Sequence, residues 1–191
     1  MFRPHLAKMI CDAKDGEYVL DPCAGWGGRM LGTVASGKGY VGFEPNDETY
    51  NNLNELVNYL KLPNVILYND VAENMNKYDF PNPDIILTSP PYYNLEIYSD
   101  KGSENDYDNY ESWREGWLKD VILKSLGHLN RGGWSCWNVH NIGKMKLIDD
   151  VRDIHERNSF NEVREFGLQS SKRQSNGCQK TNLDVTKVYQ S

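Results

Sequence analysis

The chain has 191 residues and a formal net charge of −6, with 27 acidic and 21 basic side chains. This length predicts one domain that buries about 70% of its unfolded surface and needs no cross-link to hold it. The acidic balance excludes a protein that coats nucleic acid through bulk charge, because such binding depends on Lys and Arg neutralising phosphates. A local strip of basic residues remains compatible with this net charge.

The four cysteines are scattered, with no Cys-x-x-Cys pair and no histidine beside them. They therefore predict neither a disulfide framework nor a metal site, and they indicate a reducing, cytoplasmic setting. No apolar run approaches the ~18 residues of a membrane span, and the start Met-Phe-Arg-Pro-His lacks the layout of a signal peptide. We expect a cytoplasmic protein with no metal and no membrane partner.

Short helices and apolar strands alternate through the first half of the chain. Apolar residues at helical spacing open it at residues 3–14, and a glycine-rich turn at residues 22–28 separates a strand from a helix. Residues 45–47 cap a further helix that runs to about Leu60. The expected strands are residues 17–21, 40–44, 64–68 and 84–88, and the other expected helices are residues 29–36 and 71–77.

The second half continues this pattern after a polar loop at residues 94–107, which could be a lid. Tryptophans and aliphatic residues recur at three and four residues from Asp108 to about Leu129, predicting one helix. Then follow an expected strand at residues 134–140, a helix at 144–156, a strand at 160–168, a polar stretch at 169–182 and a strand at 184–189. These elements predict an α/β fold, a doubly wound and mostly parallel sheet, in a single domain spanning residues 1–191.

The chemistry is expected where the strand at residues 84–88 ends in Ser89, Pro90, Pro91 and Tyr92. Prolines lack an N–H group, so the carbonyls of Ser89 and Pro90 have no local amide donor. An exocyclic NH2 group on a planar heterocycle could donate to the Ser89 hydroxyl and the Pro90 carbonyl, while Tyr92 stacks on its face. This stretch predicts a pocket for a nucleobase amine.

Acidic residues at three other strand ends predict a cofactor site on the same sheet edge. Glycines after Asp21 let a ligand approach the backbone, and Glu44, about twenty residues on, can accept from ribose hydroxyls. NAD would fit these two features. S-adenosylmethionine fits better, because the turn is not Gly-x-Gly-x-x-Gly, Asp21 can pair with an ammonium group, and Asp70 can accept from an adenine amine.

Three segments, Asp21-Pro-Cys-Ala-Gly-Trp-Gly-Gly28, Phe43-Glu-Pro-Asn46 and Thr88-Ser-Pro-Pro-Tyr92, resemble motifs of class I S-adenosylmethionine-dependent DNA methyltransferases that modify exocyclic amines. The resemblance runs from about Arg3 to about Val139 and implies a seven-stranded Rossmann-like sheet whose last strand is antiparallel. It also implies that Ser89, Pro90, Pro91 and Tyr92 are catalytic. The cofactor-binding set that it implies is Arg3, Pro4, Asp21, Cys23, Ala24, Gly25, Gly27, Glu44, Pro45 and Asp70.

The expected reaction is methylation of cytosine N4 or adenine N6 on a base flipped out of double-stranded DNA. The chain has no long target-recognition region, so a recognition subunit or a second copy is a possible partner. Lys172, Arg173 and Lys180 lie in the polar stretch and are expected to contact phosphates. Two alternatives stay open: methylation of an amine in RNA or on a protein glutamine, and a cofactor-binding module that depends on a partner.

Overall fold

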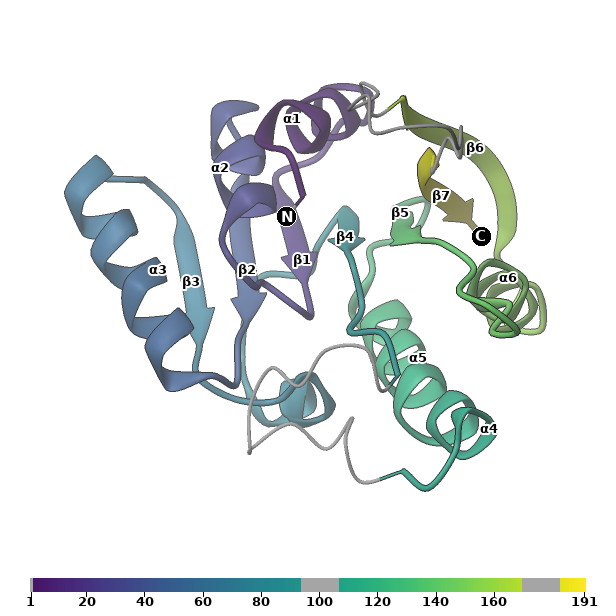
Figure 1. Cartoon of the computed structure of the whole chain (residues 1–191). Coiled ribbons are helices and arrows are strands. Elements are labelled where there is room, and N and C mark those ends of the chain that lie inside the picture. Colours follow the sequence, from purple (N-terminus) through teal and green to yellow (C-terminus); the bar gives the residue numbers. More distant parts are fainter. Residues whose placement is uncertain (1, 94–106, 170–182) are drawn as a thin grey trace, which may run out of the picture.

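The computed structural model describes residues 2–93, 107–169 and 183–191. A seven-stranded sheet runs through them with helices on both faces (Figure 1). The doubly wound α/β fold predicted from the sequence is thereby confirmed. Except for Tyr107 and Gln169, the expected lid at residues 94–107 and the polar stretch at residues 169–182 lie outside the described residues.

The sheet has the strand order β3-β2-β1-β4-β5-β7-β6, and β7 runs antiparallel to both of its neighbours. The chain moves outward from β1 to β3 and then returns to the other side of β1 to form β4. In a doubly wound sheet, ligands bind at such a reversal, beyond the carboxyl ends of the strands. The strands are β1 Tyr18–Asp21, β2 Gly39–Phe43, β3 Val65–Tyr68, β4 Ile85–Thr88, β5 Trp134–Val139, β6 Asn161–Gln169 and β7 Leu183–Gln190.

Apolar residues that alternate along the strands pack against helices on both faces of the sheet and form two separate core clusters. Ile85 and Leu87 pack with α1 residues such as Leu6, whereas Ile86 belongs to the cluster that contains Trp113 and Val121. Because side chains alternate between the two faces of a strand, an uninterrupted apolar run such as β4 is expected to be covered on both sides. The helices are α1 Pro4–Asp12, α2 Gly28–Ala35, α3 Asp47–Leu60, a 3₁₀-helix Ala72–Lys77, α4 Tyr110–Trp113, α5 Lys119–His128 and α6 Leu147–Glu156.

The helix predicted over residues 108–129 is divided. A π-helical segment, Arg114–Leu118, separates α4 from α5. At Gly116 a Cβ atom would lie only 2.4 Å from the Tyr107 ring, so this close approach requires glycine. π-Helical turns are rare and frequently occur at functional sites.

The helix predicted to begin at Lys144 begins at Leu147 instead. The preceding residues form a tight antiparallel bridge between Ile142 and Met145, with Gly143 in the left-handed region at a φ of 55°. This turn follows directly from the carboxyl end of β5. Within the described ranges, no helix has the length and apolar character needed to span a membrane.

Candidate active site

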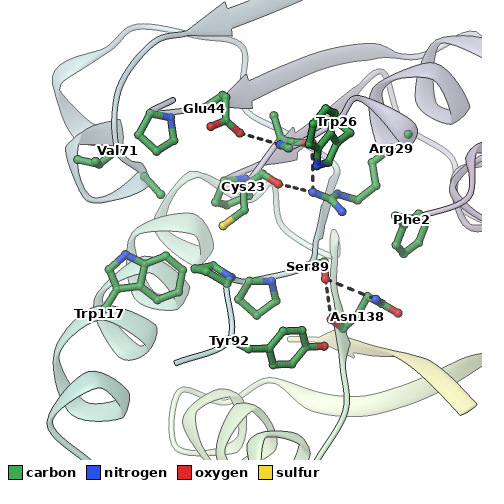
Figure 2. Close-up of a pocket in the computed structure, with 18 of the residues that line it drawn as sticks. Phe2, Cys23, Trp26, Arg29, Glu44, Val71, Ser89, Tyr92, Trp117 and Asn138 are labelled. Atoms are coloured by element: carbon green, nitrogen blue, oxygen red, sulfur yellow. Dashed lines mark hydrogen bonds between the residues drawn. The ribbon is translucent and has the colours of Figure 1, made fainter. Parts of the chain in front are cut away.

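A cavity of about 440 Å³ lies beyond the carboxyl ends of β1 and β4 (Figure 2). Its walls come from the N-terminal segment and α1, the turn after β1 and the start of α2, and the segments after β2, β3 and β4. The π-helical segment and the end of β5 complete them. Its volume falls in the usual range for small-molecule and cofactor sites. The motifs expected to hold a cofactor and a base therefore border one space.

Two glycines of the turn after β1 have different roles. Gly25 has a φ of 56°, and a Cβ atom there would meet only the Cys23 carbonyl oxygen, at 3.9 Å. It lines the cavity, so a ligand can approach its backbone. Gly27 has a φ of 78°, and a Cβ atom would lie 2.7 Å from Leu53. It was expected to contact the cofactor, but it is not among the lining residues and serves the packing of α2 against α3.

Glu44 ties the turn after β1 to the turn after β2. Its Oε2 accepts from the Gly25 N–H at 2.9 Å, and its Oε1 accepts from the Asn46 N–H at 2.9 Å. The side chain is almost fully buried yet belongs to the cavity wall (Figure 2). Cys23, Ala24 and Pro45 line the cavity beside it, where the sequence places them.

Asp21 does not face the cavity, contrary to the expectation that it would bind an ammonium group directly. Its carboxylate is fully buried and accepts from Arg29 Nε at 2.7 Å, from the Tyr40 hydroxyl at 2.8 Å and from the Thr88 hydroxyl at 2.8 Å. It also accepts from the Cys23 N–H at 3.2 Å. These donors come from β2, β4, α2 and the turn after β1, so the carboxylate joins the strands at the reversal point of the sheet.

Arg29 was not among the predicted residues, although it lines the cavity. Its guanidinium pairs with Asp21, donates to the carbonyls of Cys23 and Ala24, and lies 5.5 Å from the centre of the Phe2 ring. Burial alone would lower the pKa of Arg29, but the Asp21 carboxylate raises it above its ordinary value. The cavity wall therefore carries a permanent cation. A basic residue in the first turn of the helix that follows an acidic strand end is the signal that could have indicated it.

The Asp70 carboxylate also accepts hydrogen bonds from neighbouring groups of the protein. Its Oδ1 accepts from the Val71 N–H and from Asn74 Nδ2, both at 2.8 Å, and its Oδ2 accepts from the Tyr78 hydroxyl at 2.7 Å. Burial alone would raise the pKa of Asp70, but these hydrogen bonds hold it below its ordinary value. Asp70 does not line the cavity, whereas the next three residues, 71–73, do.

The N-terminal segment contributes only in part. Phe2 and Arg3 line the cavity, but Pro4 does not. Pro4 occupies the first turn of α1, where its missing N–H is of no consequence. Leu6, also in α1, does line the cavity, so the helix presents one face to it and Pro4 lies off that face.

The four residues of the proline turn, Ser89 to Tyr92, all line the cavity, where the sequence places them. The Ser89 hydroxyl donates to the Asn138 carbonyl at 3.2 Å, and the Tyr92 hydroxyl lies 2.7 Å from His140 Nδ1. Within the described ranges, no hydrogen bond reaches the Pro90 carbonyl. The turn thus presents oriented acceptors and an aromatic ring to the cavity.

Several lining residues were missed in the sequence. Asn138 and His140 follow the same rule as the predicted residues, because they stand at the carboxyl end of β5 on the same sheet edge. Trp117 reaches the wall from the π-helical segment, which no sequence pattern indicated. Trp26 lies within the glycine turn and is 68% exposed.

Lys172, Arg173 and Lys180, predicted to contact phosphates, lie outside the described residues. The strands that flank them are described. Gln169 pairs with Leu183 at the end of the β6–β7 ladder, and Val139 at the end of β5 pairs with Val185. The chain therefore leaves β6 and returns into β7 at the carboxyl edge of the sheet.

No protein family model matches this sequence, and no curated protein sequence matches it. Solved structures do. An rRNA methylase from Streptococcus thermophilus has a TM-score of 0.62 at 16% identity, over 100% of this chain and 98% of that chain. A methyltransferase from Pyrococcus furiosus has a TM-score of 0.65 at 15% identity, over 97% and 81% of the two chains. This chain has the class I methyltransferase fold.

A third solved structure with the class I methyltransferase fold contains a ligand. It is a candidate methyltransferase from Streptococcus mutans in complex with SAH, with a TM-score of 0.62 at 16% identity, over 99% of this chain and 98% of that chain. In the present chain, the part of the fold described contains no group of three or more His, Cys, Asp or Glu residues that could hold a metal ion. Its site instead combines a cation, a carboxylate, backbone carbonyls and aromatic rings.

Proposed function

We propose that this protein transfers a methyl group from S-adenosylmethionine to the exocyclic amine of a flipped DNA base, either cytosine N4 or adenine N6. The supporting observation is that Gly25 and Glu44 share one cavity with Ser89, Pro90 and Tyr92. A methyl donor and an amine must meet at bonding distance, so a single cavity bordered by both sets of groups meets the first requirement of the reaction.

The cofactor half of the cavity fits S-adenosylmethionine. Glu44 would accept from the ribose hydroxyls, and the permanent cation of Arg29 would pair with the carboxylate of the methionine moiety. Gly25 lets a ligand approach the backbone, because it has no Cβ atom and the nearest protein atom to that position is the Cys23 carbonyl oxygen, at 3.9 Å. The cofactor supplies an electrophilic methyl group on a sulfonium centre.

The base half of the cavity fits an amine nucleophile. The lone pair of an exocyclic amine is delocalised into its ring, so the amine attacks poorly until that pair is localised. The Ser89 hydroxyl and the Pro90 carbonyl would accept its two hydrogens and stabilise the charge that develops on nitrogen. The ring of Tyr92 would stack on the extruded base, offsetting by about 1 to 3 kcal/mol the few kcal/mol that extrusion costs.

RNA is the second candidate substrate. One observation favours it: the solved structures of the same fold include a protein described as an rRNA methylase. A protein glutamine presents a similar planar NH2 group and is a further candidate. We also propose that the chain is a single catalytic domain and that sequence recognition comes from a partner subunit or from a second copy.

The test is label transfer from S-adenosylmethionine carrying a radioactive methyl group. Duplex DNA, RNA and a glutamine-containing peptide are offered in parallel, and mass spectrometry identifies the methylated nucleoside. We expect N4-methylcytosine or N6-methyladenine in DNA. Label in RNA alone would support the second candidate, and cofactor binding without label in any substrate would support a binding module that needs a partner.

Two variants separate the roles of the two halves. Ser89→Ala and Tyr92→Ala change only the base half, so we expect turnover to fall by about 10²-fold or more while cofactor affinity measured by calorimetry stays close to normal. Loss of cofactor binding in a folded variant would contradict this division.

A further inference from the structure

Both side chains expected to contact the base are held by the end of β5. The Ser89 hydroxyl donates to the Asn138 backbone carbonyl at 3.2 Å, and the Tyr92 hydroxyl lies 2.7 Å from His140 Nδ1 (Figure 2 shows Ser89, Tyr92 and Asn138). Asn138 and His140 stand two residues apart and both line the cavity. The proline turn and the end of β5 are thus fastened together at two points.

The Asn138 contact determines how Ser89 can bond. A hydroxyl group has one hydrogen and two lone pairs. The hydrogen is directed to the Asn138 carbonyl, and Asn138 Nδ2 donates to one lone pair of Ser89 Oγ at 3.5 Å. The amide keeps this orientation because its Oδ1 accepts from the Thr186 hydroxyl of β7 at 3.2 Å. One lone pair and no hydrogen remains on the hydroxyl, so Ser89 can bond a group in the cavity only as an acceptor.

The His140 contact determines how the Tyr92 ring lies. The two ring centroids are 4.5 Å apart with an interplanar angle of 46°, so the imidazole both contacts the phenol ring and bonds its hydroxyl. A neutral imidazole that carries its hydrogen on Nε2 accepts the phenol O–H at Nδ1. The bond restrains the ring plane, and that plane is what a stacked base would meet.

His140 is itself held by a rigid turn. Ile142 and Met145 exchange two backbone hydrogen bonds, of 3.0 and 2.8 Å. Asn141 Oδ1 accepts from the Ile148 N–H at 3.0 Å, which ties this turn to α6. A side chain whose backbone is fixed on both sides can hold a neighbour in place without an additional ordering cost.

We propose that His140 is a positioning residue for the methyl-transfer site: it fixes the Tyr92 ring in the plane that receives the base, while the end of β5 sets Ser89 as an acceptor. This inference rests on the proposed function. His140 acts only through the Tyr92 hydroxyl and makes no bond to the reacting amine.

The test is a double-mutant cycle that combines His140→Phe with Tyr92→Phe. Each change keeps an aromatic ring and removes one side of the hydrogen bond. We expect each single variant to lower kcat about 5- to 10-fold, with unchanged cofactor affinity, and the double variant to be no slower than either single one. His140→Gln, which keeps a hydrogen-bonding group, should recover part of the rate.

Two outcomes would overturn the proposal. A further loss of kcat when His140→Phe is added to Tyr92→Phe would mean that the imidazole acts on the substrate or the proton directly. Unchanged kcat in His140→Phe would mean that the contact does not position the ring. His128→Phe is the matched control. His128, at the end of α5, bonds Asn76 of the 3₁₀-helix and does not line the cavity, so its replacement should leave kcat unchanged.

The outcome can be separated from failure of the proposed function. Cofactor binding and methyl transfer by the unaltered protein are measured first with the substrate identified above. If that substrate is RNA or a glutamine, the same cycle still tests whether His140 acts through Tyr92, because the ring stacks on any planar acceptor group.

Discussion

The two halves of the cavity use their polar residues in opposite ways. Beside the cofactor half, Asp21 and Asp70 stand at strand ends without lining the cavity, and their oxygens accept hydrogen bonds from the protein itself. In the base half, the Pro90 carbonyl receives no hydrogen bond within the described residues, and the Ser89 hydroxyl keeps a lone pair toward the cavity. The strand-end acids beside the first half are thus used by the protein itself, whereas the second half presents acceptors.

A position at a strand end therefore predicts that a residue lies near the site, but it does not predict which way the side chain points. Asp21 accepts hydrogen bonds from side chains of β2, β4 and α2, so it links the elements that meet where the strand order reverses. Substitutions in or beside one half leave the other half unchanged as a reference.

The largest expected effect is on folding stability in Asp21→Asn. Removing one partner of the buried pair with Arg29 leaves a cation without its counterion, a loss of about 3 to 5 kcal/mol in the free energy of unfolding. Urea denaturation measures this value. Glu111→Gln is the control, because its ion pair with Arg114 lies on a side chain that is 71% exposed and should change stability by less than about 1 kcal/mol. Normal stability with lost cofactor affinity would instead assign Asp21 to the ligand.

The next largest effect is expected on the pH dependence of folding stability, through His155, which packs against β5 and β7. His155 is buried, accepts from the Ser135 hydroxyl of β5 and stacks on Tyr189 of β7 with centroids 4.0 Å apart. Burial lowers the pKa of His155 to about 4, against an opposing effect of its bond to the Val151 carbonyl. The folded state therefore keeps this imidazole neutral under conditions in which the unfolded chain binds a proton.

Because the folded pKa lies below the unfolded value, stability from His155 is complete above about pH 6.5 and is lost as the pH falls toward 4. At 1.36 kcal/mol per pKa unit, the loss is about 3 kcal/mol by pH 4. Urea denaturation across this range should show a flatter pH dependence in His155→Gln than in the unaltered protein. His5→Gln, at an exposed position, should leave the slope unchanged. Equal slopes in all three proteins would refute the assignment.

A smaller effect is expected on cofactor binding in Glu44→Gln. The change removes a charge-assisted acceptor and should weaken binding of S-adenosylmethionine by about 1.5 to 3 kcal/mol, as measured by calorimetry. Glu48→Gln, an exposed position in the first turn of α3, is the matched control. Unchanged affinity in Glu44→Gln would leave the carboxylate with only its role in joining the two turns.

The smallest effect concerns the cations beyond β6. Replacing Lys172, Arg173 and Lys180 together with Gln should flatten the slope of log affinity for DNA against log salt by up to about 2 to 3 units. Cofactor affinity should not change. The control replaces Lys14, Lys61 and Arg131, which precede β1, β3 and β5 at the opposite edge of the sheet. If both triple variants keep the original slope, a partner subunit becomes the source of DNA contacts.

The sequence by itself determined the order of strands and helices, because apolar periodicity and turn residues act over a few neighbouring positions. The continuous apolar run of β4 indicated a strand covered on both faces, and Ile85 and Ile86 do pack into different clusters. The prolines after Ser89 indicated where that strand ends. The same local rules could not indicate the π-helical segment at Arg114–Leu118, where the Tyr107 ring packs closely on Gly116.

Only the tertiary structure decided which polar side chains face the cavity. The Asp21 carboxylate points away from it and accepts from the Thr88 hydroxyl, 67 residues away in sequence. The Tyr92 hydroxyl bonds His140, 48 residues away. Each hydrogen bond depends on donors brought together by the parallel strand order, and a buried carboxylate takes the orientation that satisfies most of them. The sequence shows the residue types and the strand ends but not these distances. It therefore located the site at one edge of the sheet, whereas the direction of each side chain depends on the fold.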